Sequence, residues 1–388
     1  MSRVRIAPLP VDEWPTGLID QANEIVGGEF RPAANVYRTL ANSPDLFTAW
    51  LHLGSHLLRR STLPARDREI VILRATALAQ APYPFTQHVR IGQQAGLTSE
   101  EIEEILDGPS TTRLAPIERL ILTTVDELMG NNTISESTWE HLQNQFTLPQ
   151  TFDLMATVAF YRLAGWVLNT CKTPLDSGQE SVLRVVNSDV TQGWSRADAV
   201  RVAPLPESEW PAKLLAETSM WPRFVLRPES RGAGVYTTLA NHADLFRSLG
   251  PLIAHFFKGS SLDDRHRELI IIRSCYRDRG EYPYRQHVAI GRQTGLHENS
   301  IAAAGASLPE LAVPAESALV GIVDQLHDTN TVSEECWREV TAHFTTRQVL
   351  DAIALAGFYG LISFILSSSG TRLEPGSVTL PAVLKTKG

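Results

Sequence analysis

A glutamate and a histidine that could exchange a proton occur twice in the chain at the same spacing. Glu69 precedes His88 by 19 residues, and Glu268 precedes His287 by the same number. A carboxylate can orient an imidazole and stabilise its charged form, and the imidazole can accept and release a proton near neutral pH. Each pair therefore predicts general acid–base chemistry, provided that the fold brings the two side chains together.

Other side chains near each pair could assist this chemistry. The hydroxyl groups of Tyr83 and Tyr282 could donate a hydrogen bond to negative charge that develops on an enolate or oxyanion. A guanidinium group matches a carboxylate bidentately, so nearby arginines are candidates for holding a substrate carboxylate, although they could equally fasten helices. The candidates for substrate binding are Arg74 and Arg273, with Arg68 and Arg267 beside them, and His56 and His255, which could instead be polar positions on a helix.

A purely structural role for these residues is the alternative. Buried ion pairs and satisfied core histidines produce similar clusters of ionisable groups. Glu, Tyr, Gln and His persist in both segments, whereas residues 75–79 of the first have changed from Ala-Thr-Ala-Leu-Ala to Ser-Cys-Tyr-Arg-Asp in the second. This selective retention favours a function, but packing can also preserve such a set, so both interpretations stay open here.

The two pairs belong to two copies of one longer segment. The sequence VRIAPLPVDEWP, which starts at Val4, returns as VRVAPLPESEWP from Val200. Residues 35–97 align without a gap with residues 234–296, and about 28 of some 63 positions are identical, which a shared helical pattern would not produce by chance. Gene duplication and fusion explain this economically. We expect a first domain at residues 1–185, a linker at 186–199 and a second domain at 200–388.

The elements that must position these residues have a helical period. Ile70, Leu73 and Ala77 recur at helical spacing, and Pro84 suits the first turn of the next helix, so a helical hairpin would fold His88 back towards Glu69. Thr98–Glu101 predicts a capping box, and Ser135 predicts another helix start. Residues 153–169 are apolar on most sides and belong deep in a core or an interface. No strand alternation is found, so the sequence predicts an all-α fold of two tandem homologous domains.

Composition excludes several classes of function. The chain has 388 residues, a net charge of -8 and a sequence pI near 5.8, with no dense Lys/Arg tract. Nucleic acid and anionic membranes are therefore not expected partners. No stretch approaches the roughly 20 apolar residues of a membrane span, and the N-terminal residues lack the apolar core of a signal peptide. We expect a cytoplasmic protein.

Cysteine and histidine spacing gives no clear metal or disulfide site. Cys171, Cys275 and Cys336 are odd in number and lack CxxC spacing, so reduced thiols are expected. His52 and His56 have the i, i+4 spacing of two metal ligands, but the second copy has proline in place of His52. We therefore expect no metal and no cofactor.

The motifs REIVILR…YPFTQHVRIGQQAGL and RELIIIR…YPYRQHVAIGRQTGL resemble the carboxymuconolactone decarboxylase family, which also contains the alkyl hydroperoxidase D-like proteins. The resemblance covers both copies almost end to end. It implies an all-α domain that assembles into oligomers, with a pocket lined partly by neighbouring subunits or domains. It also implies cofactor-free acid–base catalysis by Glu69 with His88 and by Glu268 with His287. A dimer or trimer of the fused chain would rebuild such an assembly.

The hydroperoxidase branch of the family carries a CxxC before the histidine. The matching positions here are Ala81 and Pro84, and Gly280 and Pro283 in the second copy. Without a thiolate no peroxide can be attacked, so thiol peroxidase activity is not expected. We expect a cofactor-independent lyase or isomerase that decarboxylates, isomerises, cyclises or eliminates from a small carboxylate, lactone or enol. The alternative is a non-catalytic small-molecule-binding or scaffold protein on the same helices.

Overall fold

The helices fall into two series with the same order and similar lengths. The computed structural model describes residues 4–186, 197, 199–220 and 233–373, and no strand occurs among these residues, so the all-α prediction is confirmed for them. The first series runs through α1 (Leu18–Val26), α2 (Asn35–Leu40), α3 (Pro44–Ser55), a π-helical turn η2 (His56–Arg60), α4 (Ala65–Leu78), α5 (Pro82–Gln94), α6 (Ser99–Asp107), α7 (Pro116–Asn131), α8 (Glu136–Gln145) and α9 (Leu148–Cys171), after a short 3-10 turn η1 (Val11–Glu13).

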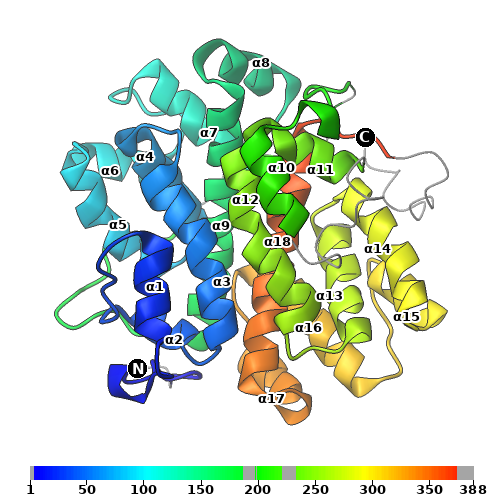
Figure 1. Cartoon of the computed structure of the whole chain (residues 1–388). Coiled ribbons are helices and arrows are strands. Elements are labelled where there is room, and N and C mark those ends of the chain that lie inside the picture. Colours follow the sequence, from blue (N-terminus) through cyan, green and yellow to red (C-terminus); the bar gives the residue numbers. More distant parts are fainter. Residues whose placement is uncertain (1–3, 187–196, 198, 221–232, 374–388) are drawn as a thin grey trace.

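The second series repeats this order. It begins with a 3-10 turn η3 (Glu207–Glu209) and α10 (Ala212–Met220) and continues through α11 (Gly234–Leu239), η5 (Ala240–His242), α12 (Ala243–Ala254), a π-helical turn η6 (His255–Gly259), α13 (Asp264–Arg277), α14 (Glu281–Gln293), α15 (Glu298–Ala304), α16 (Pro314–Thr329), α17 (Glu334–His343) and α18 (Thr346–Ser368). Figure 1 shows the two series side by side, with α9, α18, α3 and α12 in the middle of the molecule.

Local sequence signals account for most helix starts. Thr98 accepts from the backbone N–H of Glu101 and Glu101 accepts from that of Thr98, which is the predicted capping box of α6. Ser135 caps α8 as predicted. The helix that carries His88 begins at Pro82 rather than Pro84, because either proline fits a first turn that needs no N–H donor.

The two longest helices form the core between the series. Nearly every residue of α9 and α18 is buried, and the two helices pack against each other along the middle of the molecule. Gly357 of α18 permits the close approach, since a Cβ atom there would lie 2.6 Å from the Cβ of Leu163. An apolar surface this complete must be covered by other helices, which is why both lie at the centre.

One helix differs from the prediction that no stretch approaches the roughly 20 apolar residues of a membrane span. Among the described residues, α18 (Thr346–Ser368) is long and apolar enough to cross a membrane by length and composition. All of its most apolar window is buried by the rest of the protein, and the core helix of a soluble protein passes the same test.

The predicted division at residues 186–199 falls almost wholly outside the described residues, and the domain boundaries stay a prediction. The preceding segment is described and returns to the first series. Asp176 accepts hydrogen bonds from the backbone N–H of Asn35 and from the hydroxyl of Tyr83. This segment therefore covers part of α2 and α5 instead of extending freely between two domains.

Candidate active site

A carboxylate, an imidazole and a phenol form a continuous hydrogen-bonded chain in the first series. Nδ1 of His88 lies 2.6 Å from Oε2 of Glu69, and its Nε2 lies 2.8 Å from the hydroxyl oxygen of Tyr161. The three residues come from α5, α4 and α9, so three separate helices meet at this point. We call this group the first relay.

The second series contains the same arrangement, which we call the second relay. Nδ1 of His287 lies 2.6 Å from Oε2 of Glu268, and its Nε2 lies 2.8 Å from the hydroxyl oxygen of Tyr359. These residues lie on α14, α13 and α18. The predicted meeting of glutamate and histidine therefore occurs in both copies, with closely matching geometry.

The hairpin between α4 and α5 closes tightly beside the first relay. Gly92 lies one turn beyond His88, and a Cβ atom there would lie 3.0 Å from a methyl carbon of Leu97 and 3.3 Å from one of Leu73. It would also lie 3.7 Å from the Cβ of Glu69. Glycine at this position lets α5 lie close to α4, which places the imidazole against the carboxylate.

The Tyr161 hydroxyl is protonated at neutral pH. Burial raises the pKa of the Tyr161 hydroxyl well above its ordinary value of 10.0, and the negative charge of Glu69 raises it further. The phenol therefore stays protonated at neutral pH and can donate to Nε2 of His88. We assign the ring proton of His88 to Nδ1, where it is donated to Glu69, since this uses both nitrogens of a neutral imidazole.

The relay is nearly enclosed. Glu69 has no exposed surface, while His88 retains 6% and Tyr161 retains 4% of theirs. A reactant would therefore meet the histidine and tyrosine end of the relay before the carboxylate. The low exposure of the relay also strengthens the hydrogen bonds and charge interactions among its three residues.

One arginine lies directly beside each relay. Nε of Arg68 lies 3.3 Å from Oε1 of Glu69, and Nε of Arg267 lies 3.1 Å from Oε1 of Glu268. Arg267 also pairs with Asp264 at 2.5 Å and lies over the ring of Phe257. The first copy has Ala65 and Leu58 at the matching positions, so the surroundings of the two arginines differ.

The predicted hydrogen-bond donors Tyr83 and Tyr282 are not part of the relays. The hydroxyl of Tyr83 accepts from the backbone N–H of Val36 and donates to Asp176. The hydroxyl of Tyr282 accepts from the backbone N–H of Val235. These phenols lie on the first turns of α5 and α14, where they fasten α2 and α11 instead of reaching the histidines.

Arg74 and Arg273 have a structural role, which corrects their prediction as substrate ligands. Arg74 is 1% exposed and its guanidinium binds both carboxylate oxygens of Asp126, at 2.6 and 2.7 Å. Arg273 pairs with Asp324 at 2.6 Å and donates to two backbone carbonyls, one at the last residue of α15 and one just after it. Arg74 on α4 and Arg273 on α13 therefore point away from the relays. Arg74 connects α4 to α7, and Arg273 connects α13 to α16.

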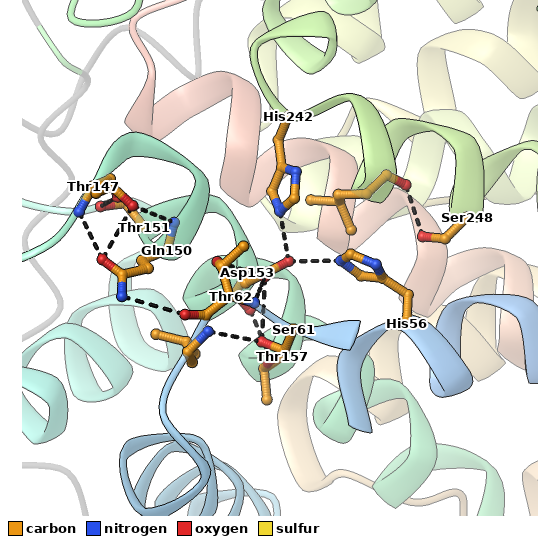
Figure 2. A network of polar contacts seen from close by, with 12 residues as sticks. His56, Ser61, Thr62, Thr147, Gln150, Thr151, Asp153, Thr157, His242 and Ser248 are labelled. Carbon is orange, nitrogen blue, oxygen red and sulfur yellow. Dashed lines mark hydrogen bonds and ion pairs between the residues drawn. The ribbon is translucent and has the colours of Figure 1, made fainter. Parts of the chain in front are cut away.

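His56 and His255 also lie away from the relays, which corrects their prediction as substrate-binding residues. Nε2 of His56 lies 2.8 Å from Oδ1 of Asp153, and Nε2 of His255 lies 2.8 Å from Oδ1 of Asp351. Figure 2 shows that a third residue, His242 of η5, also points at Asp153, with its Nε2 at 2.9 Å. Both carboxylates belong to the long core helices.

The cysteines are unsuited to nucleophilic chemistry. All three are buried and unpaired. Burial raises the pKa of the Cys171 thiol to about 12 and that of Cys336 to about 11. Burial likewise raises the pKa of Cys275 well above its usual value. Thiolate is therefore scarce at neutral pH at each position.

Sequence reasoning missed the two tyrosines that complete the relays. Tyr161 and Tyr359 recur at equivalent positions in the two copies, which was the available signal. They lie within runs of apolar residues on α9 and α18, where a tyrosine would be interpreted as another residue of the hydrophobic core. Nothing in the spacing indicates that these helices cross the His88 and His287 hairpins.

Comparison with known proteins agrees with the resemblance seen in the motifs. Residues 44–126 match the model of the carboxymuconolactone decarboxylase family. This segment runs from α3 to α7 and contains Glu69 and His88. No curated protein and no solved structure matched the chain. The match to the carboxymuconolactone decarboxylase family is limited to residues 44–126 of the first copy, and the tandem relation of the second copy remains a prediction from its repeated motifs.

Proposed function

We propose that this protein is a cofactor-independent acid–base enzyme that acts on a small carboxylate, lactone or enol. The observation that carries this proposal is the repeated relay of glutamate, histidine and tyrosine. A base oriented by a carboxylate and joined to a hydroxyl group has the parts needed for proton transfer. The match of residues 44–126 to a family named for a decarboxylase supports the same class of chemistry.

The proton path follows from the protonation assigned above. Tyr161 takes a proton from a carbon next to the substrate carbonyl while its own hydroxyl proton passes to Nε2 of His88. Glu69 accepts a hydrogen bond from the Nδ1 proton and stabilises the imidazolium that forms. Reversal of these transfers delivers the proton to a different substrate atom, which isomerises the substrate. In a decarboxylation no carbon proton is removed first: carbon dioxide leaves, the electron pair of the broken C–C bond stays on the substrate as an enolate, Tyr161 donates its hydroxyl proton to that carbon, and solvent returns a proton to Tyr161.

The substrate carboxylate would bind Arg68 rather than Arg74. Arg68 lies next to Glu69 and its side chain is 15% exposed, whereas the guanidinium of Arg74 is committed to Asp126. A guanidinium there also stabilises the negative charge of an enolate. Buried thiols with raised pKa values support a reaction without cysteine.

Exchange of substrate hydrogen with solvent tests the proposal without knowledge of the natural substrate. The full chain is incubated in D2O with a panel of small lactones and 3-oxo carboxylates, and deuterium uptake at the carbon next to the carbonyl is followed by NMR. We expect exchange with at least one compound. Replacement of both His88 and His287 by Gln should lower the exchange rate by roughly 10²-fold or more.

The matched control replaces His141 of α8 and His343 of α17, which are exposed, by Gln. We expect unchanged exchange in this control and similar melting temperatures for both variants. Exchange that survives the loss of His88 and His287 in a folded protein would disprove the acid–base role. A large fall in melting temperature with no change in exchange would assign the relays to stability and favour the scaffold alternative.

A further inference from the structure

The structure assigns a second site to His56, Asp153 and His242, and we propose that it binds one divalent transition-metal ion. Its three candidate ligand atoms all lie within 4.8 Å of one another, and the three residues are buried. Two imidazole nitrogens and one carboxylate oxygen form a ligand set that suits zinc, cobalt and iron. The site is separate from the relays and does not depend on the proposed function.

Two imidazoles converge on a single oxygen atom. Nε2 of His56 and Nε2 of His242 lie 2.8 and 2.9 Å from Oδ1 of Asp153, and Figure 2 shows both rings directed at this carboxylate from different sides. Ligands of a tetrahedral zinc ion at about 2.0–2.1 Å from the metal lie about 3.3 Å apart. Each N···O distance must therefore lengthen by about half an ångström, and the two imidazole nitrogens, which lie within 4.8 Å of each other, must approach to about the same separation of 3.3 Å.

The other oxygen of the carboxylate is held by the protein. Oδ2 of Asp153 accepts from the backbone N–H and hydroxyl of Thr62 and from the hydroxyl of Ser61. These bonds fix the orientation of the carboxylate and leave Oδ1 facing the two imidazoles. Outer hydrogen bonds of this kind orient metal ligands in proteins.

The ligands come from both halves of the molecule. His56 begins the π-helical turn after α3, Asp153 lies on α9, and His242 ends η5 just before α12. An ion at this point would connect the first series of helices to the second. Bound metal would therefore stabilise the contact between α3 and α12.

The second copy supplies an internal comparison. Asp351 binds Nε2 of His255 and the hydroxyl of Ser260, so one histidine and the outer hydrogen bond are retained. The residue that corresponds to His242 is Ser43. The site around Asp351 therefore lacks the third ligand, and we expect it to bind no metal.

Imidazole ligands also limit the choice of ion. Calcium and magnesium prefer oxygen ligands, whereas imidazole suits zinc, cobalt, iron and copper. Three protein ligands leave a fourth position for water or another small ligand. We use zinc and cobalt as the test ions.

The test measures metal content of the purified full-length chain. The protein is treated with EDTA, incubated with zinc sulfate or cobalt chloride, separated from free ions by gel filtration and analysed by mass spectrometry for metals. We expect about one ion per chain. Cobalt in the site should give a visible spectrum distinct from that of hydrated cobalt, and zinc should raise the melting temperature of the EDTA-treated protein.

Matched variants locate the ion. His56→Gln and His242→Ser should each lower the metal content to below about one tenth of an ion per chain, whereas His255→Gln should leave it unchanged. Each variant's melting temperature without metal shows that it is folded. Equal losses in His56→Gln and His255→Gln would overturn the proposal, as would wild-type protein that retains no ion.

A gain of binding completes the experiment. Ser43 has backbone angles of φ -131 and ψ 85, and His242 has φ -132 and ψ 81. Ser43→His should therefore direct an imidazole towards Asp351 and raise the metal content towards two ions per chain. Should wild type bind about one ion while both His56→Gln and His242→Ser retain it, the ion lies elsewhere and the assignment fails.

Discussion

The hydroxyl oxygen of Tyr161 lies 2.8 Å from Nε2 of His88, and burial raises the pKa of that hydroxyl further above neutral pH. This contact changes the expected chemistry of the site. The imidazole has no free nitrogen, because Nδ1 lies against Glu69 and Nε2 lies against the Tyr161 hydroxyl. Tyrosine is therefore the group that we expect to touch the substrate, and histidine acts through it.

The first prediction concerns this tyrosine. Replacement of both Tyr161 and Tyr359 by Phe should lower kcat for solvent exchange by roughly 10²-fold, since proton transfer loses its terminal group. The control is Tyr284→Phe, another buried tyrosine, which should leave kcat unchanged. Exchange at the wild-type rate in the double variant would show that His88 acts directly on the substrate.

The second prediction concerns the asymmetry between the two copies. Arg267 pairs with Asp264 and lies over Phe257. In the first copy, the residues that match Asp264 and Phe257 are alanine and leucine, so Arg68 lacks these two neighbours. Arg68→Gln should therefore raise KM for a carboxylate substrate by about tenfold or more, which corresponds to one charged hydrogen bond. Arg267→Gln should raise KM less. Equal effects of both substitutions would contradict a difference in anion binding.

The fold could be predicted further than the site. Helical spacing, the capping residues Thr98 and Ser135, and the repeated motifs led to an all-α protein with a glutamate and a histidine in contact. The partners of Arg74 and His56 could not be predicted, because Asp126 and Asp153 are 52 and 97 residues away in sequence. Such contacts depend on how helices cross, which a local pattern does not determine.

The role of Tyr161 was hidden for a related reason. Its neighbours on α9 are apolar, and its hydroxyl forms a hydrogen bond with His88 on another helix. The contact between His242 and Asp153 is still more difficult to predict from the sequence, because it joins the two copies and does not form within one copy. Repetition in the sequence indicates what the copies share, but it cannot indicate what forms where they meet.

The third prediction concerns stability. Arg74 and Asp126 are each 1% exposed and form a bidentate ion pair, so Arg74→Met should lower the free energy of unfolding by about 3–5 kcal/mol by leaving a buried carboxylate without this partner. Arg273→Met should cost less, because Asp324 is 21% exposed and keeps Arg277. Urea denaturation followed by circular dichroism compares the two. A larger loss for Arg273→Met would contradict this ranking.

The fourth prediction concerns the thiols. Burial and raised pKa values should keep Cys171, Cys275 and Cys336 from reacting with a thiol-specific reagent such as dithionitrobenzoate in the native protein at pH 8. All should react in guanidinium chloride. A fast-reacting thiol in the native protein, accompanied by turnover of hydrogen peroxide, would reinstate the peroxidase chemistry that the absence of CxxC argues against.

The last prediction concerns alkaline pH. Burial raises the pKa of Tyr284 to about 12 from its ordinary value of 10.0. In the unfolded chain this tyrosine ionises near pH 10, while in the folded protein it stays protonated, so ionisation favours unfolding. Its contribution to stability is therefore complete below about pH 10 and is lost as the pH rises through 12.

The variant Tyr284→Phe tests this loss of stability. The first copy has Phe85 at the matching position, which makes this substitution a conservative change. This variant should match wild type in unfolding free energy at pH 8 and exceed it by about 2–3 kcal/mol near pH 12. Parallel loss of stability in both proteins between pH 8 and 12 would show that Tyr284 titrates normally in the folded state.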